Sequence, residues 1–235
     1  MSEHINDIDL WHGELLGDAD RYQAYWRVLD RSEQAHAQKL TNDLLHRRYV
    51  EVHGRLRNIL AETLDQPADS IRIEKSAYGK PYLADHPHVA FNLSHSGNNL
   101  LIAVGRDCRL GVDLEICKPR TNLSALVGKC FAEEEAAYWN NLPEVEKIPA
   151  FYRFWTRKEA LVKATGRGIA LGLNDCVINP VKPTAFLRVP PECGQPSQWQ
   201  VLDIDVGQGI CAAIAADKPI VGISYKSDKP VLIVD

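Results

Sequence analysis

The order of hydrophobic and polar positions divides the chain into two successive blocks. In the first block, residues 22–64 place apolar side chains roughly at helical spacing, as Val50, Leu56, Ile59 and Leu60 illustrate. Strands are predicted before and after this helical stretch, at residues 5–11, 71–75, 89–93, 100–104 and 110–116. The turn at residues 96–99 is expected to make the strands on either side of it neighbours.

A second block with the same rhythm follows the break at Lys118-Pro119-Arg120. Its helices are predicted at residues 132–140 and 149–164, and its strands at residues 176–178, 199–205, 210–215 and 220–225. The chain is therefore expected to have an α+β fold made of two similar halves, residues 1–117 and 118–235. The longer helix, 149–164, belongs to the second half.

The composition is that of a globular protein and excludes some partners. Of 235 residues, 45% are hydrophobic, and the formal net charge of −4 argues against a general nucleic-acid binder. No apolar run approaches the ~18 residues of a membrane span. The N-terminal residues lack a signal peptide's apolar region, and the six scattered cysteines form no C-x-x-C pair. We expect reduced thiols and a cytoplasmic location.

Two carboxylates alternate in Gly111-Val112-Asp113-Leu114-Glu115. On a strand, Asp113 and Glu115 would point to one face while the two apolar residues face the core. Two adjacent carboxylates suit Mg²⁺, which takes one or two carboxylates together with substrate phosphates. A half-buried strand with a solvated acidic face would have the same pattern.

The helix at 149–164 carries a second set of candidates. Trp155, Glu159 and Lys163 follow one another at intervals of four and share a face, with Lys158 beside them. Gly166 is expected to end the helix. In the alternative interpretation, Glu159 and Lys163 form only a surface ion pair that contributes a few tenths of a kcal/mol.

Ser94 and His95 are adjacent, which suggests a hydrolase, but the pattern G-x-S-x-G is absent. Adjacent residues on a strand also point to opposite faces. His95 then donates a hydrogen bond to a phosphate or is structural. Arg47, Arg48 and Lys80 are cations that are either solvated or converge on one phosphate.

In order and spacing, these motifs resemble the 4′-phosphopantetheinyl transferase superfamily, specifically the surfactin-synthetase-activating (Sfp) type. The resemblance runs through Arg47-Arg48, Tyr78-Gly79-Lys80-Pro81, residues 91–96, residues 111–115 and residues 155–168. It implies a pseudo-dimer of two α+β halves, each a helix packed on an antiparallel sheet, with the active site in the cleft between them. The implied activity, that of a holo-[acyl-carrier-protein] synthase, moves the 4′-phosphopantetheine arm of coenzyme A to a serine of an apo carrier protein. The products are holo-carrier protein and 3′,5′-ADP, with Mg²⁺ (or Mn²⁺) on the pyrophosphate.

The resemblance also implies roles for individual residues. The catalytic residues are Glu159 and Lys163, and the metal ligands are Asp113, Glu115 and Glu159. Coenzyme A would contact Arg48, Lys80, Ser94, His95, Asp113, Lys158 and Lys163. Further candidates at the site are Arg47, Glu135 and Trp155. The carrier protein would dock on Leu123, Leu126 and Val127. In this family type the first helix often carries lysines where this chain has Glu33 and His36, so contacts to the 3′-phosphate could instead involve Arg31, Lys39 or Arg47.

The partners implied are coenzyme A and acyl, peptidyl or aryl carrier proteins, with no nucleic acid and no membrane, and the protein is expected to be a monomer. One alternative is a non-catalytic module that binds coenzyme A or a carrier protein. It would be expected to lack some of Asp113, Glu115, Glu159 and Lys163, and all four are present. The other alternative is a Mg²⁺-dependent phosphohydrolase, which would release phosphopantetheine to water without a carrier.

Overall fold

The computed structural model describes residues 6–16 and 19–226. The helices are α1 (Ala19–Val28), α2 (Arg31–Gln38), α3 (Asp43–Leu64), α4 (Leu123–Cys130), α5 (Glu133–Asn140) and α6 (Glu144–Thr165). The first six strands are β1 (Asn6–Glu14), β2 (Ile73–Lys75), β3 (Pro81–Leu83), β4 (Val89–Ser96), β5 (Asn99–Arg106) and β6 (Leu110–Ile116). The others are β7 (Val177–Ile178), β8 (Phe186–Arg188), β9 (Gln200–Ile204), β10 (Ile210–Ala216) and β11 (Ile220–Lys226).

Two larger sheets form the centre of the molecule. The first has the strand order β11-β1-β5-β4 and the second has the order β6-β10-β9, while β2-β3 and β7-β8 are separate pairs. All neighbouring strands are antiparallel except β1 and β11, which are parallel. The α+β class is therefore confirmed.

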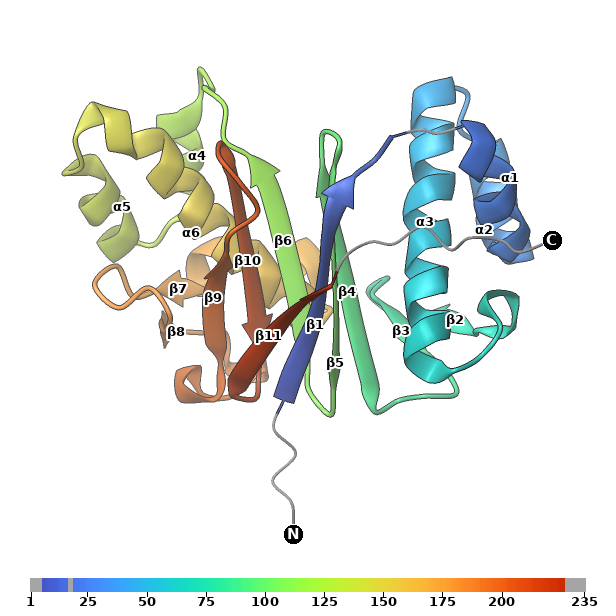
Figure 1. The fold of residues 1–235 in the computed structure, drawn as a ribbon. Helices are drawn as coiled ribbons and strands as arrows, with labels where there is room; N and C mark the ends of the chain where they lie inside the picture. Colours follow the sequence, from blue (N-terminus) through green and yellow to red (C-terminus); the bar gives the residue numbers. More distant parts are fainter. Residues whose placement is uncertain (1–5, 17–18, 227–235) are drawn as a thin grey trace, which may run out of the picture.

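The elements lie in the order helix, sheet, sheet, helix, with α1–α3 on one side of the two sheets and α4–α6 on the other (Figure 1). Helix α3 packs Val52, Leu56 and Leu60 on the outer face of the first sheet. Between the sheets, apolar side chains of β1 and β5 meet those of β6 and β10, among them Leu10, Leu101, Val112 and Ile214. Helix α6 covers the outer face of the second sheet. None of the helices in the described ranges has the length and apolar character that crossing a membrane requires.

The sheets do not follow the predicted division at residue 117. Strand β6 comes from residues 1–117 but pairs with β10, and β11 comes from residues 118–235 but pairs with β1. Each range therefore contributes one strand to the other range's sheet. Hydrophobic periodicity shows that a segment is a strand but not which sheet it joins, so the exchange is invisible in the sequence pattern.

Strands β4 and β6 are joined by side chains instead of by a backbone ladder. The N–H groups of Val112, Leu114 and Ile116 donate to Asn92 Oδ1 at 2.8 Å, Ser94 Oγ at 3.3 Å and Ser96 Oγ at 3.4 Å, respectively. Alternate residues of β4 therefore satisfy alternate N–H groups along the edge of β6. We call this set of contacts the β4–β6 zipper.

Several helices begin or end at other residues than the sequence pattern predicts. The helical stretch 22–64 is three helices, because Asp30 forms a capping box with Glu33 at the start of α2 and Asn42 caps α3. Helix α6 begins at Glu144, so Pro149 lies inside it instead of starting it. The predicted strands at 89–93, 100–104 and 110–116 are confirmed as β4, β5 and β6. Ile5, predicted to begin the first strand, lies outside the described residues.

Gly111 lets β6 approach the backbone of α6 directly. A Cβ atom at this position would lie 2.1 Å from the carbonyl oxygen of Ala160 and 2.3 Å from the amide nitrogen of Ala164. Both are backbone atoms, which no change of rotamer can move away. The glycine therefore sets the distance between the strand that carries Asp113 and the helix that carries Lys163.

Gly111→Ala should lower the free energy of unfolding by about 2–3 kcal/mol, because the added methyl group pushes β6 and α6 apart. Gly128→Ala is the matched control, since a Cβ there meets no atom within 4 Å and the position is helical. The free energy of unfolding of Gly128→Ala should be about 0.5–1 kcal/mol higher than that of the native protein. Urea denaturation measures both, and equal stability of Gly111→Ala and the native protein would contradict the close approach.

Candidate active site

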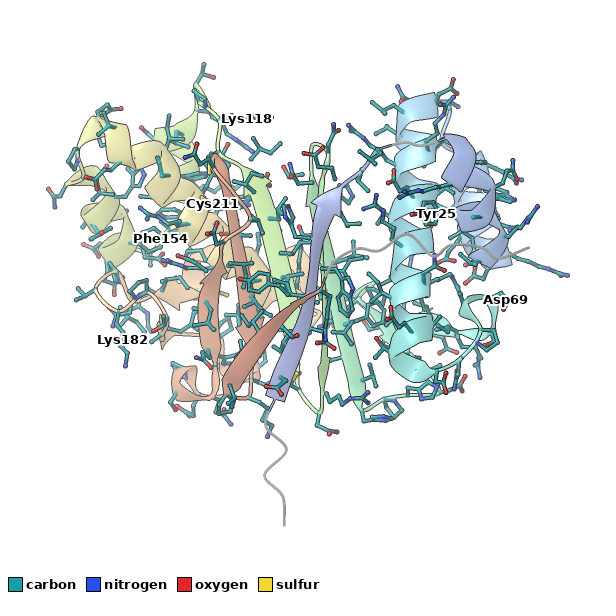
Figure 2. The ribbon with its side chains drawn as sticks, in the orientation of Figure 1. Tyr25, Asp69, Lys118, Phe154, Lys182 and Cys211 are labelled. Atoms are coloured by element: carbon teal, nitrogen blue, oxygen red, sulfur yellow. The ribbon has the colours of Figure 1, made fainter. Side chains whose placement is uncertain are left out.

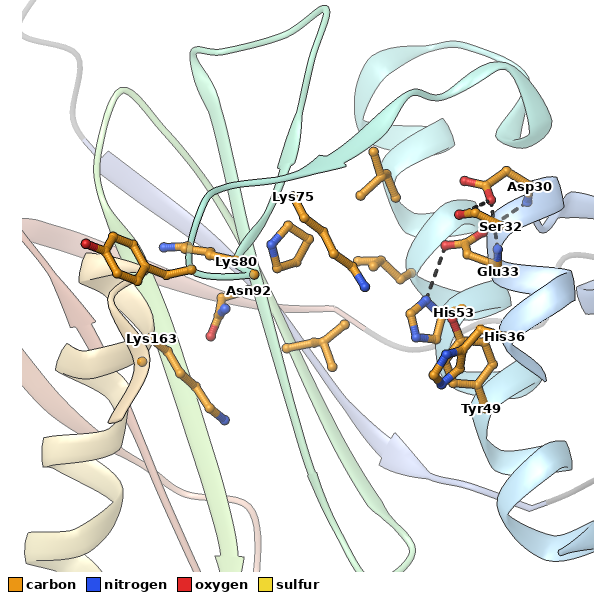
Figure 3. Close-up of a pocket in the computed structure, with 18 of the residues that line it drawn as sticks. Asp30, Ser32, Glu33, His36, Tyr49, His53, Lys75, Lys80, Asn92 and Lys163 are labelled. Atoms are coloured by element: carbon orange, nitrogen blue, oxygen red, sulfur yellow. Dashed lines mark hydrogen bonds and ion pairs between the residues drawn. The ribbon is translucent and has the colours of Figure 1, made fainter. Parts of the chain in front are cut away.

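A pocket of about 770 Å³ opens between α2, α3, the β2–β3 hairpin, β4 and α6 (Figure 3). Lys163 of α6 lies on the side of the pocket away from His36 and Tyr49, and Glu159 of the same helix also lines the pocket. The polar residues that line the remainder include Asp30, Ser32, Glu33, His36, Lys39, Tyr49, His53, Lys75, Lys80 and Asn92. The pocket therefore connects the helix with the predicted catalytic residues to the helices on the other side of the two sheets.

Ser94, Asp113 and Lys163 form a tight cluster at the edge of this pocket. The ammonium group of Lys163 donates to Asp113 Oδ1 at 2.7 Å and to Ser94 Oγ at 2.8 Å, and Ser94 Oγ donates to Asp113 Oδ1 at 2.9 Å. Asp113 is only 5% exposed. Within the described part of the chain, no donor reaches its other oxygen, Oδ2, although that atom is buried. The cluster thus leaves one carboxylate oxygen without a partner, which is costly unless a cation or donor binds there.

Glu115 and Glu159 complete a set of acidic groups. Ser96 Oγ donates to Glu115 Oε2 at 2.8 Å, which holds this carboxylate on the same face of β6 as Asp113. The pKa of Glu159 lies above its usual value, first because the group is largely buried and then because Asp113 is close. Lys163 opposes this rise and Glu115 adds to it. The carboxylates are therefore near enough to repel one another.

The acidic set fits a divalent cation that is shared with a substrate. Among residues 6–16 and 19–226, no three His, Cys, Asp or Glu side chains converge closely enough to enclose a metal by themselves. Mg²⁺ does not require such a cage, because it usually takes one or two carboxylates and completes its shell with water and phosphate oxygens. The buried, unpartnered Oδ2 of Asp113 is the atom that fits this role.

Lys158 and Glu135 are corrected by the structure, because both are completely buried. The three N–H donors of Lys158 go to Glu135 Oε2 at 2.6 Å and to the carbonyl oxygens of Leu173 at 2.8 Å and Cys176 at 2.7 Å. Glu135 also accepts from the N–H groups of Ala132 and Ile178. Lys158 therefore has no donor left for a phosphate, and Glu135 is not placed to hold a metal.

The buried pair has the pKa shifts expected of charges removed from water. Burial raises the pKa of Glu135, and the charge of Lys158 opposes that rise. Burial lowers the pKa of Lys158, and the charge of Glu135 opposes the fall. The pair ties α5 and α6 to β7 and acts as a structural bridge.

Lys80 lines the pocket, but most of its ammonium group is engaged. It donates to the carbonyl oxygens of Leu110 and Ala164, each at 2.8 Å. Burial lowers the pKa of Lys80 to about 8. Lys80 therefore fastens the hairpin to the start of β6 and the end of α6, and at most one donor remains for a ligand.

Other predicted coenzyme A contacts lie apart from the pocket lining. Arg48 donates to Asn98 in the β4–β5 turn, and Arg47 is exposed. His95 is exposed on β4, and its pKa is lowered by partial desolvation and by the charges of Lys163, Arg48 and His53. Trp155 is partly buried and stacks on Phe151.

The predicted carrier-docking residues face inward. Val127 is 3% exposed and belongs to the hydrophobic core around α6. Leu123 and Leu126 are partly buried against the same core. These side chains share one face of α4, which packs on the core and leaves Leu123 and Leu126 partly exposed. Val127 is therefore corrected from a docking residue to a core residue.

Sequence reasoning missed two groups. Asn92 and Ser96 form the β4–β6 zipper with Ser94, and their spacing of two residues was the signal that they share a face. Along the pocket, the ring of His36 packs tilted against Tyr49 with centroids 4.8 Å apart, and Tyr49 stacks on His53 with centroids 4.0 Å apart. Glu33 Oε1 lies 3.2 Å from His53 Nδ1. These residues lie on separate turns of α2 and α3, so only the folded helices bring them together.

Comparison with known proteins gives consistent results for both parts of the chain. The profile described as "4′-phosphopantetheinyl transferase superfamily" matches residues 109–215, and that described as "4′-phosphopantetheinyl transferase, N-terminal" matches residues 18–106. The 4′-phosphopantetheinyl transferase HetI of Nostoc sp. is 31% identical over 214 residues, covering 89% of this chain and 87% of the relative. The 4′-phosphopantetheinyl transferase ffp of Bacillus subtilis is 29% identical over 73% of this chain and 77% of its own length. The L-aminoadipate-semialdehyde dehydrogenase-phosphopantetheinyl transferase of Xenopus laevis is 29% identical over 64% of this chain and 55% of its own.

Lys158→Met should lower the free energy of unfolding by about 3–5 kcal/mol, because it leaves the Glu135 carboxylate buried without its partner. Adding Glu135→Gln to the Lys158→Met variant should restore part of the lost free energy of unfolding, because the amide carries no charge. Urea denaturation measures both effects. The double variant should bind coenzyme A as the native protein does, and a weakened affinity measured by calorimetry would restore Lys158 as a phosphate contact.

Proposed function

Because the chain belongs to the 4′-phosphopantetheinyl transferase superfamily, we propose that it transfers the 4′-phosphopantetheine arm of coenzyme A to a serine of an apo carrier protein. The products are holo-carrier protein and 3′,5′-ADP. This is holo-[acyl-carrier-protein] synthase chemistry, and we assign the chain to the surfactin-synthetase-activating type. The acceptors are acyl, peptidyl or aryl carrier proteins, and the protein acts as a cytoplasmic monomer.

One observation carries this proposal. Lys163 lines a pocket of about 770 Å³ and, at its edge, bonds the buried carboxylate of Asp113, whose Oδ2 has no donor within the described residues. A cation and an unpartnered carboxylate oxygen side by side are suited to a pyrophosphate and its counter-ion. The pocket is also large enough for a ligand of the size of coenzyme A.

The arrangement supports a pseudo-dimer with a cleft active site. In this proposal α3 on the first sheet corresponds to α6 on the second, and residues 1–117 and 118–235 are the two halves with β6 and β11 exchanged. The pocket is lined from α2, α3 and α6, so both halves contribute to it. Neither half alone would then bind the substrate.

Coenzyme A would lie along the pocket with its pyrophosphate at Lys163 and its 3′-phosphate at the opposite end. Away from Lys163, the pocket is lined by His36, His53 and Lys75 (Figure 3), and Lys39 also lines it. Lys75 points into the pocket toward His53 (Figure 3). We expect these basic residues, instead of Arg48, Ser94 and His95, to attract the 3′-phosphate, since Ser94 is committed to Asp113 and Lys163.

The chain's own residues position and neutralise the reacting groups. Asp113 and Glu115 would hold Mg²⁺, which when bound neutralises charge on the pyrophosphate. Lys163 is fixed by Asp113 and Ser94 next to the pocket, where its positive charge stabilises the phosphate oxygen of the departing 3′,5′-ADP. The serine oxygen of the carrier forms a bond to the phosphorus of the pantetheine side, and the bond from that phosphorus to the ADP oxygen breaks with its electron pair on ADP.

Glu159 would accept the proton that the serine loses. Its raised pKa makes it a stronger base than an ordinary glutamate, while proximity to Lys163 favours its ionised form. Its position on α6, one turn before Lys163, places base and leaving-group stabiliser on one rigid element. Lys118, Arg120 and Lys129 are exposed around α4 and would meet an acidic carrier protein.

The direct test is intact-protein mass spectrometry of apo carrier proteins incubated with the protein, coenzyme A and Mg²⁺. We expect one carrier or more to gain about 340 Da, the mass of one phosphopantetheine arm. No gain on any carrier, with coenzyme A binding intact, would favour the binding module. Release of phosphopantetheine without any carrier would favour the phosphohydrolase.

Glu159→Gln should lower kcat by about 10²–10⁴-fold and leave coenzyme A affinity nearly unchanged, because it removes the base and not the binding contacts. The matched control is Glu144→Gln on the same helix, whose side chain is exposed and pairs with Lys147. It should keep native activity. Equal turnover of the two variants in the carrier assay would remove Glu159 as the base.

Lys75→Gln should raise KM for coenzyme A by about tenfold, the loss expected for one charge-assisted phosphate contact. With dephospho-coenzyme A, which lacks the 3′-phosphate, the same variant should have the native KM. Arg72→Gln is the control, because Arg72 lies one residue before the same hairpin, pairs with Glu74 and Asp85 and does not line the pocket. An equal rise in KM with both substrates would place the 3′-phosphate elsewhere.

A further inference from the structure

Two cysteines meet at the end of β6. Cys117 directly follows this strand, and Cys211 is the second residue of β10. Their Sγ atoms are 2.9 Å apart, although both residues are free cysteines. Cys211 and Lys118, the residue after Cys117, lie at the same end of the second sheet (Figure 2). Both residues are only partly buried, at the margin of the core around α6.

The backbone holds the two thiols in place. Cys211 is paired with Glu115 in the ladder between β10 and β6, and the N–H of Cys117 donates to the carbonyl oxygen of Gly209 at 2.8 Å. A disulfide has an S–S distance of about 2.05 Å, so the sulfur atoms need to approach by less than about 1 Å. Cys211 lies opposite Glu115 in the ladder, so Cys117 is its diagonal neighbour at the end of β6. Closing the bond requires rotation of both side chains together with a small shift of the strand ends.

The other four cysteines have no such geometry. Cys130, Cys176 and Cys193 are buried in the core around α6, where an oxidant has little access. Cys108 is partly exposed, but within the described residues its Sγ contacts no second sulfur. Access and a sulfur partner therefore occur together at Cys117 and Cys211.

We propose that Cys117 and Cys211 are a modification site, where a low-molecular-weight disulfide such as oxidised glutathione converts the two thiols into a reversible cross-strand disulfide. One protein thiolate attacks a sulfur of the oxidant, and the first glutathione leaves as its thiolate. The second protein thiolate attacks the mixed disulfide and releases the second glutathione. The two cysteines together lose two electrons and two protons. These electrons and protons are taken up by the oxidised glutathione, which becomes two molecules of reduced glutathione.

The bond would cross-link the two strands beside Glu115. It joins residues that are 94 positions apart and encloses α4, α5 and α6. Such a link stabilises the fold by restricting the unfolded chain. Its effect falls on the segment that carries Glu159 and Lys163, while the residues of α2, α3 and β2 that line the pocket are untouched. Oxidation would therefore stabilise the protein.

The test uses the full-length protein, first reduced with dithiothreitol, then freed of it and exposed to oxidised glutathione. The native protein should lose two titratable thiols and about 2 Da of mass, and dithiothreitol should reverse both changes. Its Tm should rise by on the order of 10 °C on oxidation. Cys108→Ser is the matched control and should respond as the native protein does.

Cys117→Ser and Cys211→Ser should fail to cross-link and instead carry glutathione on the remaining thiol, a gain of about 305 Da. Their Tm should not rise with oxidation, and Cys117→Ala provides a second variant if the serine disturbs folding. A native protein that ends unmodified or only glutathionylated would overturn the proposal. So would a cross-link that persists in Cys117→Ser. These readouts do not involve transfer activity, so the outcome of this test is independent of whether the proposed function is correct.

Discussion

The site depends on the hydrogen bonds that three polar side chains of β4 make to the edge of β6. Asn92, Ser94 and Ser96 accept from the backbone of a strand that belongs to the other sheet. The two serine hydroxyl groups then donate to Asp113 and Glu115. A single set of contacts thus satisfies the backbone N–H groups along the edge of β6 and orients both carboxylates. Loss of one serine would remove a structural bond and an orienting bond at once.

Buried charges fasten the elements around this centre in two places. Arg57 is completely buried and donates to Asp30, Glu33 and two backbone carbonyl groups, which fixes α2 on α3. Lys158 and Glu135 do the same for α6, α5 and β7. Every donor of Lys158 is engaged, so the cost of desolvation is offset by well-formed bonds. The helices on either side of the pocket are therefore anchored by buried ion pairs, which suits a site that has to position its ligand.

The sequence predicts the parts of the site that depend on local periodicity. The shared face of Asp113 and Glu115 follows from strand alternation, and the interval between Glu159 and Lys163 follows from the helix repeat. The family resemblance implied a coenzyme A contact for Lys158 and carrier docking for Val127, but both side chains are buried. Neither resemblance nor periodicity reveals which face of a helix meets solvent. The partners of Lys80 lie 30 and 84 positions away, and the exchange of β6 and β11 is also long-range. Such pairings depend on the three-dimensional arrangement of the chain.

The parallel pairing of β11 with β1 has a consequence for the order of events during synthesis. Asp7 pairs with Gly222, so β1 leaves the ribosome long before its outer neighbour is made. Until then, one edge of the first sheet displays unpaired N–H and C=O groups, which are prone to pairing with other chains. Contacts this distant in sequence also slow folding. The first sheet is completed only after residue 226 has emerged, so assembly cannot proceed as one finished half followed by the other.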